Sequence, residues 1–174
     1  MHDRRGEGSA LNDLGNSSFQ QKKWDDAVSF YSEYRNISHE IGDWMGEGNA
    51  WGNTGNVYLS QGNIGDAIEC YEMRLEIERR NGDKRREGSA LGSLGTAYAR
   101  SGDIKNALFC YEQQLAITRQ FNDLVGLAVV SKNLANLHKH MGNITMALAY
   151  AEESARIFIH LNDILNAQQV QKLS

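Results

Sequence analysis

Residues 48–71 read GNAWGNTGNVYLSQGNIGDAIECY, and residues 88–111 read GSALGSLGTAYARSGDIKNALFCY. The two stretches begin forty residues apart and share most of their glycines, alanines and tyrosines at equivalent places. The same register extends along the chain, because Gly-Asp at 42–43 returns as Gly-Asp at 82–83 and as Asn-Asp at 122–123 and 162–163. A fixed period of this length predicts a stacked array, in which each unit buries its apolar face against its neighbours.

Small residues mark two equivalent positions in every unit. They are Gly15, Gly55, Gly95 and Ala135 in one series, and Ala27, Ala67, Ala107 and Ala147 in the other. A glycine inside a helix costs roughly 0.5–1 kcal/mol relative to alanine, so its recurrence predicts that close packing offsets this cost. We therefore expect the two helices of each unit to cross at these positions.

Each unit has the pattern of two helices joined by a tight turn. In the second unit, apolar and small residues recur at helical spacing over 47–61 and again over 64–77. Gly62-Asn63 separates them, because glycine permits a left-handed turn and asparagine is a good helix N-cap. The repeats are predicted at about 6–45, 46–85, 86–125 and 126–165. A final half-repeat helix at about 164–174, with one polar face, would cap the array.

The composition limits the classes of function. The chain has 174 residues, a net charge of −4 and no basic cluster, which argues against nucleic-acid binding. We see neither a membrane-spanning run nor a signal peptide, so the expected location is cytoplasmic and off the membrane. Cys70 and Cys110 lie one period apart, beyond the reach of a disulfide, and are expected to be buried thiols.

The repeated residues resemble the signature of the tetratricopeptide repeat family, whose helix-turn-helix unit is usually nearer 34 residues. The matching residues are Trp51, Gly55, Tyr58, Gly62, Ala67 and Tyr71 in the second unit, and Leu91, Gly95, Tyr98, Gly102, Ala107 and Tyr111 in the third. A forty-residue spacing is similar to the long-repeat subtype of Pins-type scaffolds and bacterial signalling proteins. The resemblance covers the whole chain, 1–174, and implies an all-α, right-handed superhelical solenoid of about four units plus the capping helix.

In this family the first helices of the units line a concave groove that holds a peptide. The resemblance carries this role to Asn12, Asp13, Asn16, Asn49, Asn53, Asn56, Ser93, Thr96, Arg100, Lys132, Asn133 and Asn136, with Arg74 and Gln114 on the second helices adding selectivity. Asparagine offers a donor and an acceptor, so a ladder of asparagines can pair with a peptide backbone. Asparagine beside glycine is also a common turn or cap residue. Asn16, Asn56 and Asn136 lie in mid-helix, where asparagine is unfavourable, and this favours a ligand role for them.

We therefore expect a non-enzymatic module that binds a peptide segment of a protein partner and needs no cofactor or metal ion. The histidines lack metal-ligand spacing, and the glycines at 52–55 lack the lysine of a phosphate loop. Binding of a terminal carboxylate is disfavoured, because only Lys132 with Asn136 fits the family's carboxylate clamp.

Two alternatives stay open. The chain begins inside an inter-repeat junction, which is expected of a piece cut from a longer array. It could be a regulatory arm of a larger signalling enzyme. The uncovered face of the first unit could instead support self-association into a homo-oligomer.

Overall fold

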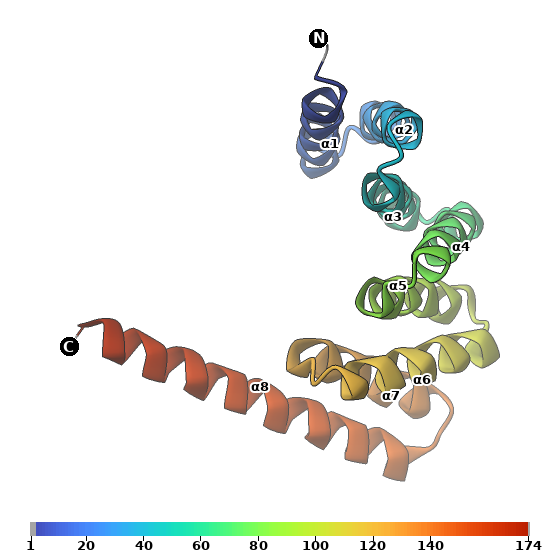
Figure 1. Cartoon of the computed structure of the whole chain (residues 1–174). Helices are drawn as coiled ribbons and strands as arrows, with labels where there is room; N and C mark the ends of the chain where they lie inside the picture. Colours follow the sequence, from blue (N-terminus) through green and yellow to red (C-terminus); the bar gives the residue numbers. More distant parts are fainter. Residues whose placement is uncertain (1–2, 174) are drawn as a thin grey trace.

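The computed structural model describes the backbone of residues 3–173 and the side chains of residues 3–162. Within these residues it contains eight helices and no strand. The helices are α1 (Arg4–Gln20), α2 (Trp24–Glu40), α3 (Trp44–Gln61), α4 (Ile64–Asn81), α5 (Lys84–Ser101), α6 (Ile104–Gln120), α7 (Leu124–His140) and α8 (Ile144–Leu173). Each helix packs against the helix before it and the helix after it, so the pairs stack into a curved solenoid (Figure 1). The predicted all-α repeat architecture is confirmed.

The turns between helices use the residues that the sequence pattern indicates. Gly62 and Gly102 end α3 and α5 in the left-handed conformation, each with φ of 84°. The links between successive units end in an aspartate that caps the next helix: the Asp43 and Asp83 side chains accept from the backbone N–H groups of residues 46 and 86, at 3.0 Å each. Where no glycine is present, Lys22 and Asn122 take the left-handed conformation.

Tyrosine rings lie directly on the helical glycines where the two helices of a unit cross. A Cβ atom added to Gly55 would lie 2.7 Å from the Tyr71 ring, and one added to Gly95 would lie 2.8 Å from the Tyr111 ring. Both rings are almost completely buried. The close helix crossing predicted at these glycines is therefore present, and the side chain that fills it is the tyrosine sixteen residues later in the chain.

The core is divided along the array rather than gathered in one place. One buried cluster joins α4 to α5 around Tyr71 and Leu91, and another joins α6 to α7 around Tyr111 and Leu134. Cys70 and Cys110 are buried free thiols, as predicted. Burial raises the pKa of each thiol to about 11.

The end of the array differs from the prediction. A break was expected at Asn162-Asp163 with a separate capping helix at 164–174, but α8 runs unbroken from Ile144 to Leu173. Neither residue of the pair is glycine, and their propensity penalty within a helix is small, so the pair alone does not end a helix. The side chains from residue 163 onward lie outside the described residues.

Candidate functional site

In the first two pairs, α1 and α3 lie on the inner side of the curve, and α2 and α4 lie on the outer side (Figure 1). We define three junctions between successive units: junction I is formed by α1, α2 and α3, junction II by α3, α4 and α5, and junction III by α5, α6 and α7. Three positions of each junction are equivalent in the repeat. They hold Tyr34, Ser38 and Gly46 in junction I, Arg74, Glu78 and Arg86 in junction II, and Gln114, Thr118 and Gly126 in junction III.

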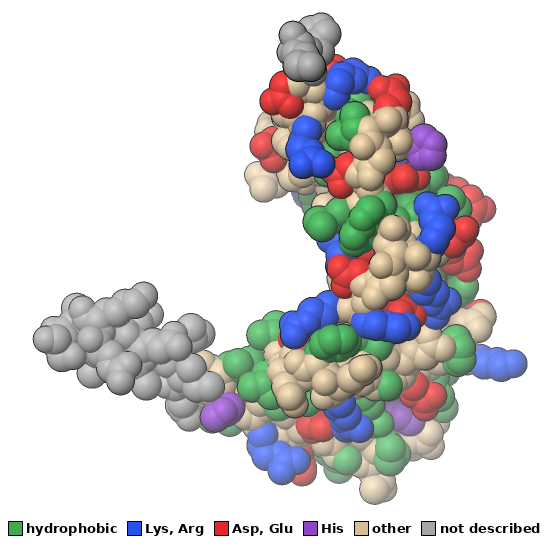
Figure 2. All heavy atoms as spheres, viewed as in Figure 1, with side chains coloured by type: hydrophobic (Ala, Val, Ile, Leu, Met, Phe, Trp, Pro, Cys, Tyr) green, Lys and Arg blue, Asp and Glu red, His purple; other side chains and the backbone are tan. Residues whose placement is uncertain are grey.

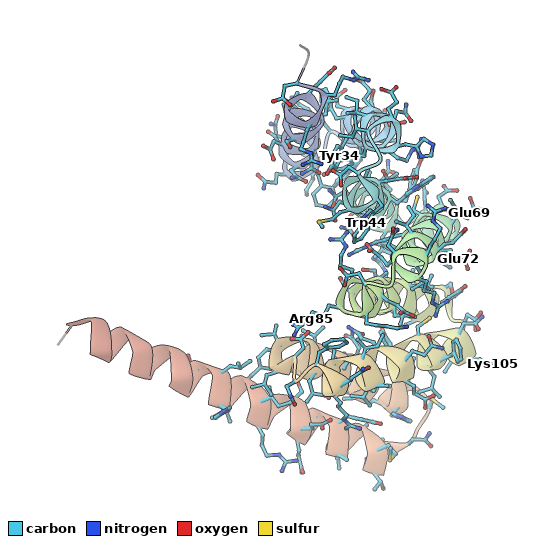
Figure 3. All side chains as sticks on the ribbon, viewed as in Figure 1. Tyr34, Trp44, Glu69, Glu72, Arg85 and Lys105 are labelled. Carbon is cyan, nitrogen blue, oxygen red and sulfur yellow. The ribbon has the colours of Figure 1, made fainter. Side chains whose placement is uncertain are left out.

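Junction I is filled by the side chain of Tyr34, labelled in Figure 3. A Cβ atom added to Gly8 would lie 3.3 Å from the Tyr34 ring, and one added to Gly46 would lie 2.9 Å from its hydroxyl. Burial raises the pKa of Tyr34, opposed by the side chains of Asn49 and Ser38. The ring and hydroxyl therefore occupy the space that the small residues around them leave.

Junction II is filled by three charged side chains. Glu78 is fully buried, and both its carboxylate oxygens accept from Arg86 Nε, at 3.0 and 2.9 Å. Arg86 also donates to Asn49 Oδ1 at 2.8 Å. Arg74 Nε lies 3.8 Å from Glu78 Oε1, while Arg74 Nη2 donates to Ser89 Oγ at 3.3 Å. Two guanidinium groups thus share one buried carboxylate, and burial lowers the pKa of Arg74.

Junction III holds shorter side chains and contains a hollow of about 420 Å³. Gln114 stands at its wall with only 7% of its surface exposed. Among the described residues, no donor reaches its Oε1 atom. Four of the residues that line the hollow are exposed: Val125 and Val129 of α7, at 57% and 41%, and Arg85 and Ser89 of α5. The hollow therefore combines two exposed valines with a buried acceptor that meets no donor among the described residues.

A second hollow of about 460 Å³ continues between α5 and α7. It shares Thr96 and Asn133 with the first, and adds Arg100, Asn136 and His140. We call the two hollows together the inner trough. Apolar and basic side chains lie side by side on the inner surface between α5 and α7 (Figure 2). The trough therefore offers apolar contact, amides, hydroxyls and positive charge in one place.

The structure gathers six of the predicted groove residues in the inner trough: Ser93, Thr96, Arg100, Gln114, Asn133 and Asn136. It does not bring the others there. Asn12 and Asn53 pair with each other at 2.9 Å, whereas Asn49 and Arg74 belong to junction II. Asp13 and Lys132 are exposed and do not line the trough.

Two mid-helix asparagines have a role within the repeat itself. Asn56 Oδ1 accepts from the Tyr71 hydroxyl at 2.7 Å, and Asn16 Oδ1 accepts from the Tyr31 hydroxyl at 2.9 Å. These bonds account for asparagine in mid-helix without any ligand. Asn136 differs, because Ala151 stands where the other units carry that tyrosine.

Asn56→Ala is expected to lower the free energy of unfolding by about 0.5–1.5 kcal/mol, because it leaves the Tyr71 hydroxyl without its acceptor. Asn136→Ala, which removes no tyrosine partner, is expected to change it by less than about 0.5 kcal/mol. Urea denaturation of the two variants checks this difference. Equal losses would mean that the Tyr71–Asn56 bond contributes nothing to stability.

Other trough residues are missed by the sequence prediction. Thr118, Phe121, Val125 and Gly126 line the first hollow without belonging to any family motif position. The repeat register could have indicated this hollow, because the side chains equivalent to Arg74, Glu78 and Arg86 are all smaller in the next unit.

Within the described residues, we find no acidic, cysteine or histidine cluster that could hold a metal ion, and no helix with the length and apolarity needed to cross a membrane.

The sequence pattern of the tetratricopeptide repeat matches residues 7–80 and 86–160. No curated protein matches the chain.

Several solved structures have a similar fold. BtubC from P. vanneervenii is 22% identical with a TM-score of 0.83, over 93% of this chain and 67% of that one. Aspartyl phosphate phosphatase F from Bacillus subtilis is 14% identical with a TM-score of 0.86, over 98% and 45%. The STAND protein PH0952 from Pyrococcus horikoshii, which has a tetratricopeptide repeat sensor, is 18% identical with a TM-score of 0.83, over 97% and 26%. This chain thus spans less than half the length of the last two.

Proposed function

The chain belongs to the tetratricopeptide repeat family, and from this premise we propose that it is a non-enzymatic module that binds a peptide segment of a protein partner in the inner trough. The repeat fold of this family is typically a protein-interaction module without catalytic activity. The observation that carries the proposal for this chain is the pair of linked hollows between α5 and α7. In the wall of one of them stands Gln114, whose Oε1 meets no donor among residues 3–162.

The chemistry of the trough suits an extended peptide. A peptide backbone presents an N–H donor and a C=O acceptor at nearly every residue, and the amides of Gln114 and Asn133 offer both complementary groups. Val125 and Val129 add exposed apolar surface at the rim. A partner segment can therefore gain hydrogen bonds along its backbone and bury an apolar side chain in the same place.

The proposal is tested by capture of the partner from a lysate of the native cells on immobilised protein. Asn133→Arg places a long cation in a wall that both hollows share, and is expected to weaken capture at least about tenfold, or about 1.4 kcal/mol. Gln120→Arg is the matched control, because Gln120 is exposed and its equivalent in the preceding unit is Arg80. Undiminished capture by Asn133→Arg, with its fold intact, would contradict the proposal.

We infer a second candidate from one of the similar structures, in which the repeats serve as the sensor of a signal-transduction ATPase. In that case this chain would be the regulatory segment of a larger signalling protein and its trough would contact another domain of that protein. The reading frame of the gene tests this candidate. An adjoining catalytic domain would support it, and a frame that ends with these repeats would contradict it.

A further inference from the structure

We propose that the junction III hollow receives a tyrosine side chain of the bound partner segment, with the tyrosine hydroxyl donating to Gln114 Oε1. This inference rests on the proposed function, because it names the side chain that the trough would recognise. It draws on a comparison of the three junctions, which are repeats of one another but are filled in different ways.

Junction I shows which side chain fits a junction built from small residues. The walls of the two junctions correspond closely: Gly8 is equivalent to Gly88, Ser38 to Thr118 and Gly46 to Gly126. In junction I, Tyr34 fills the space and lies against Gly8 and Gly46. Junction III keeps these small walls but has the shorter Gln114 at the tyrosine position. Gln114 turns toward Gly92, and its atoms are not among those nearest Gly88 or Gly126. Part of the space that Tyr34 fills in junction I is therefore open in junction III.

Gln114 supplies the acceptor for such a ligand. Its side chain is 93% buried, and it packs so closely on α5 that a Cβ atom added to Gly92 would lie 2.6 Å from Gln114 Nε2. The amide is thus held in place at the wall of the hollow, yet among the described residues no donor reaches Gln114 Oε1. A buried acceptor without a donor favours any ligand that brings one, and a phenol brings an O–H group.

Junction II shows why a partner arginine is a poorer occupant. There the guanidinium groups of Arg74 and Arg86 are held by the buried carboxylate of Glu78. Thr118 replaces that carboxylate in junction III, and Arg85 stacks on Phe121 at 5.0 Å on the wall of the hollow. The lining acid, Asp123, already accepts from the backbone N–H of Gly126 at 2.9 Å. Arg85 thus disfavours a second cation, while the exposed side chains of Val125 and Val129 favour an aromatic ring.

The test uses p-cresol, the side-chain analogue of tyrosine, followed by two-dimensional NMR of the full chain. We expect p-cresol to shift the Gln114 side-chain amide together with the backbone signals of Thr118 and Gly126, and to bind at least about threefold more tightly than toluene, which lacks the hydroxyl. Methylguanidinium, the analogue of arginine, is expected to bind more weakly than p-cresol.

A second test uses a variant in which a side chain of the protein itself fills the hollow. Gln114→Tyr restores the arrangement of junction I, and is expected to abolish the p-cresol shifts and to raise the melting temperature. Gln120→Tyr adds the same side chain at an exposed position and should leave the p-cresol shifts unchanged. The comparison of the three small molecules needs only the wild-type chain, so it decides the matter even if Gln114→Tyr does not fold.

Three results would overturn the inference: no shift at junction III with p-cresol, toluene binding as tightly as p-cresol, or methylguanidinium binding more tightly. Each would leave the wider proposal intact if Asn133→Arg still weakened partner capture. Loss of the wider proposal would instead appear as capture that is insensitive to Asn133→Arg.

Discussion

Glu78→Ala is expected to lower the free energy of unfolding by about 3–5 kcal/mol. The Glu78 side chain is fully buried, and its carboxylate lies 2.8 Å from Arg86 Nη2 and 3.8 Å from Arg74 Nε. Removing one partner of a buried ion pair leaves the remaining charge without compensation in a medium of low polarity. Here two guanidinium groups lose their shared carboxylate at once. The decrease in the free energy of unfolding should therefore be among the largest that single substitutions cause.

Urea denaturation, followed by circular dichroism, measures this loss. The triple variant Arg74→Gln, Glu78→Thr and Arg86→Gly is the control, because it gives junction II the residues that junction III carries naturally. It removes all three charges together, so no buried charge is left unpaired, and it is expected to lose less stability than Glu78→Ala alone. If Glu78→Ala cost less than about 1 kcal/mol, the charged network would not hold junction II together.

Gly95→Ala is expected to lower the free energy of unfolding by about 1–3 kcal/mol, although alanine is the better helix former. The added methyl group would lie 2.8 Å from ring atoms of Tyr111, closer than real Cβ contacts. Tyr111 is buried on all sides and cannot move away without displacing its neighbours in α7. The steric cost therefore exceeds the gain in helix propensity.

A double-mutant cycle with Tyr111→Ala tests the cause of this effect. The fourth unit already pairs Ala135 with Ala151 at the equivalent positions, so alanine is tolerated there once the ring is absent. Gly95→Ala is accordingly expected to cost little in a Tyr111→Ala background, which gives a coupling free energy of at least about 0.5 kcal/mol. Additive losses would mean that the glycine is required for another reason.

Much of the fold could be predicted from the sequence because it depends on local chemistry repeated at a fixed period. Gly62 and Gly102 set the turns through backbone conformation alone, and aspartates such as Asp83 cap helices through their nearest N–H groups. The continuity of α8 was not predicted. Asn-Asp disfavours a helix only mildly, so it does not by itself end one, whereas the same pair at 122–123 forms a turn where α7 packs against α6.

The candidate site was predicted only in part, because it depends on side-chain volumes contributed by three helices. The family pattern placed Ser93, Thr96 and Asn133 on the groove side of the first helices, and in the structure these residues line the inner trough. Their role in binding stays a prediction. The pattern could not show that Asn56 accepts from Tyr71, since that partner lies on the neighbouring helix. It also could not show that junction III is open, because this follows from the combined size of Gln114 and the residues packed around it.

Site-specific photo-crosslinking tests the central claim most directly. The photoreactive residue p-benzoylphenylalanine replaces Ser93 on the wall of the trough, or Lys105 on the outer side of the array (Figure 3). Irradiation in the native lysate is predicted to give a covalent adduct with one protein from position 93 and none from position 105. Adducts from position 105, with none from position 93, would contradict the claim that the inner trough binds the partner.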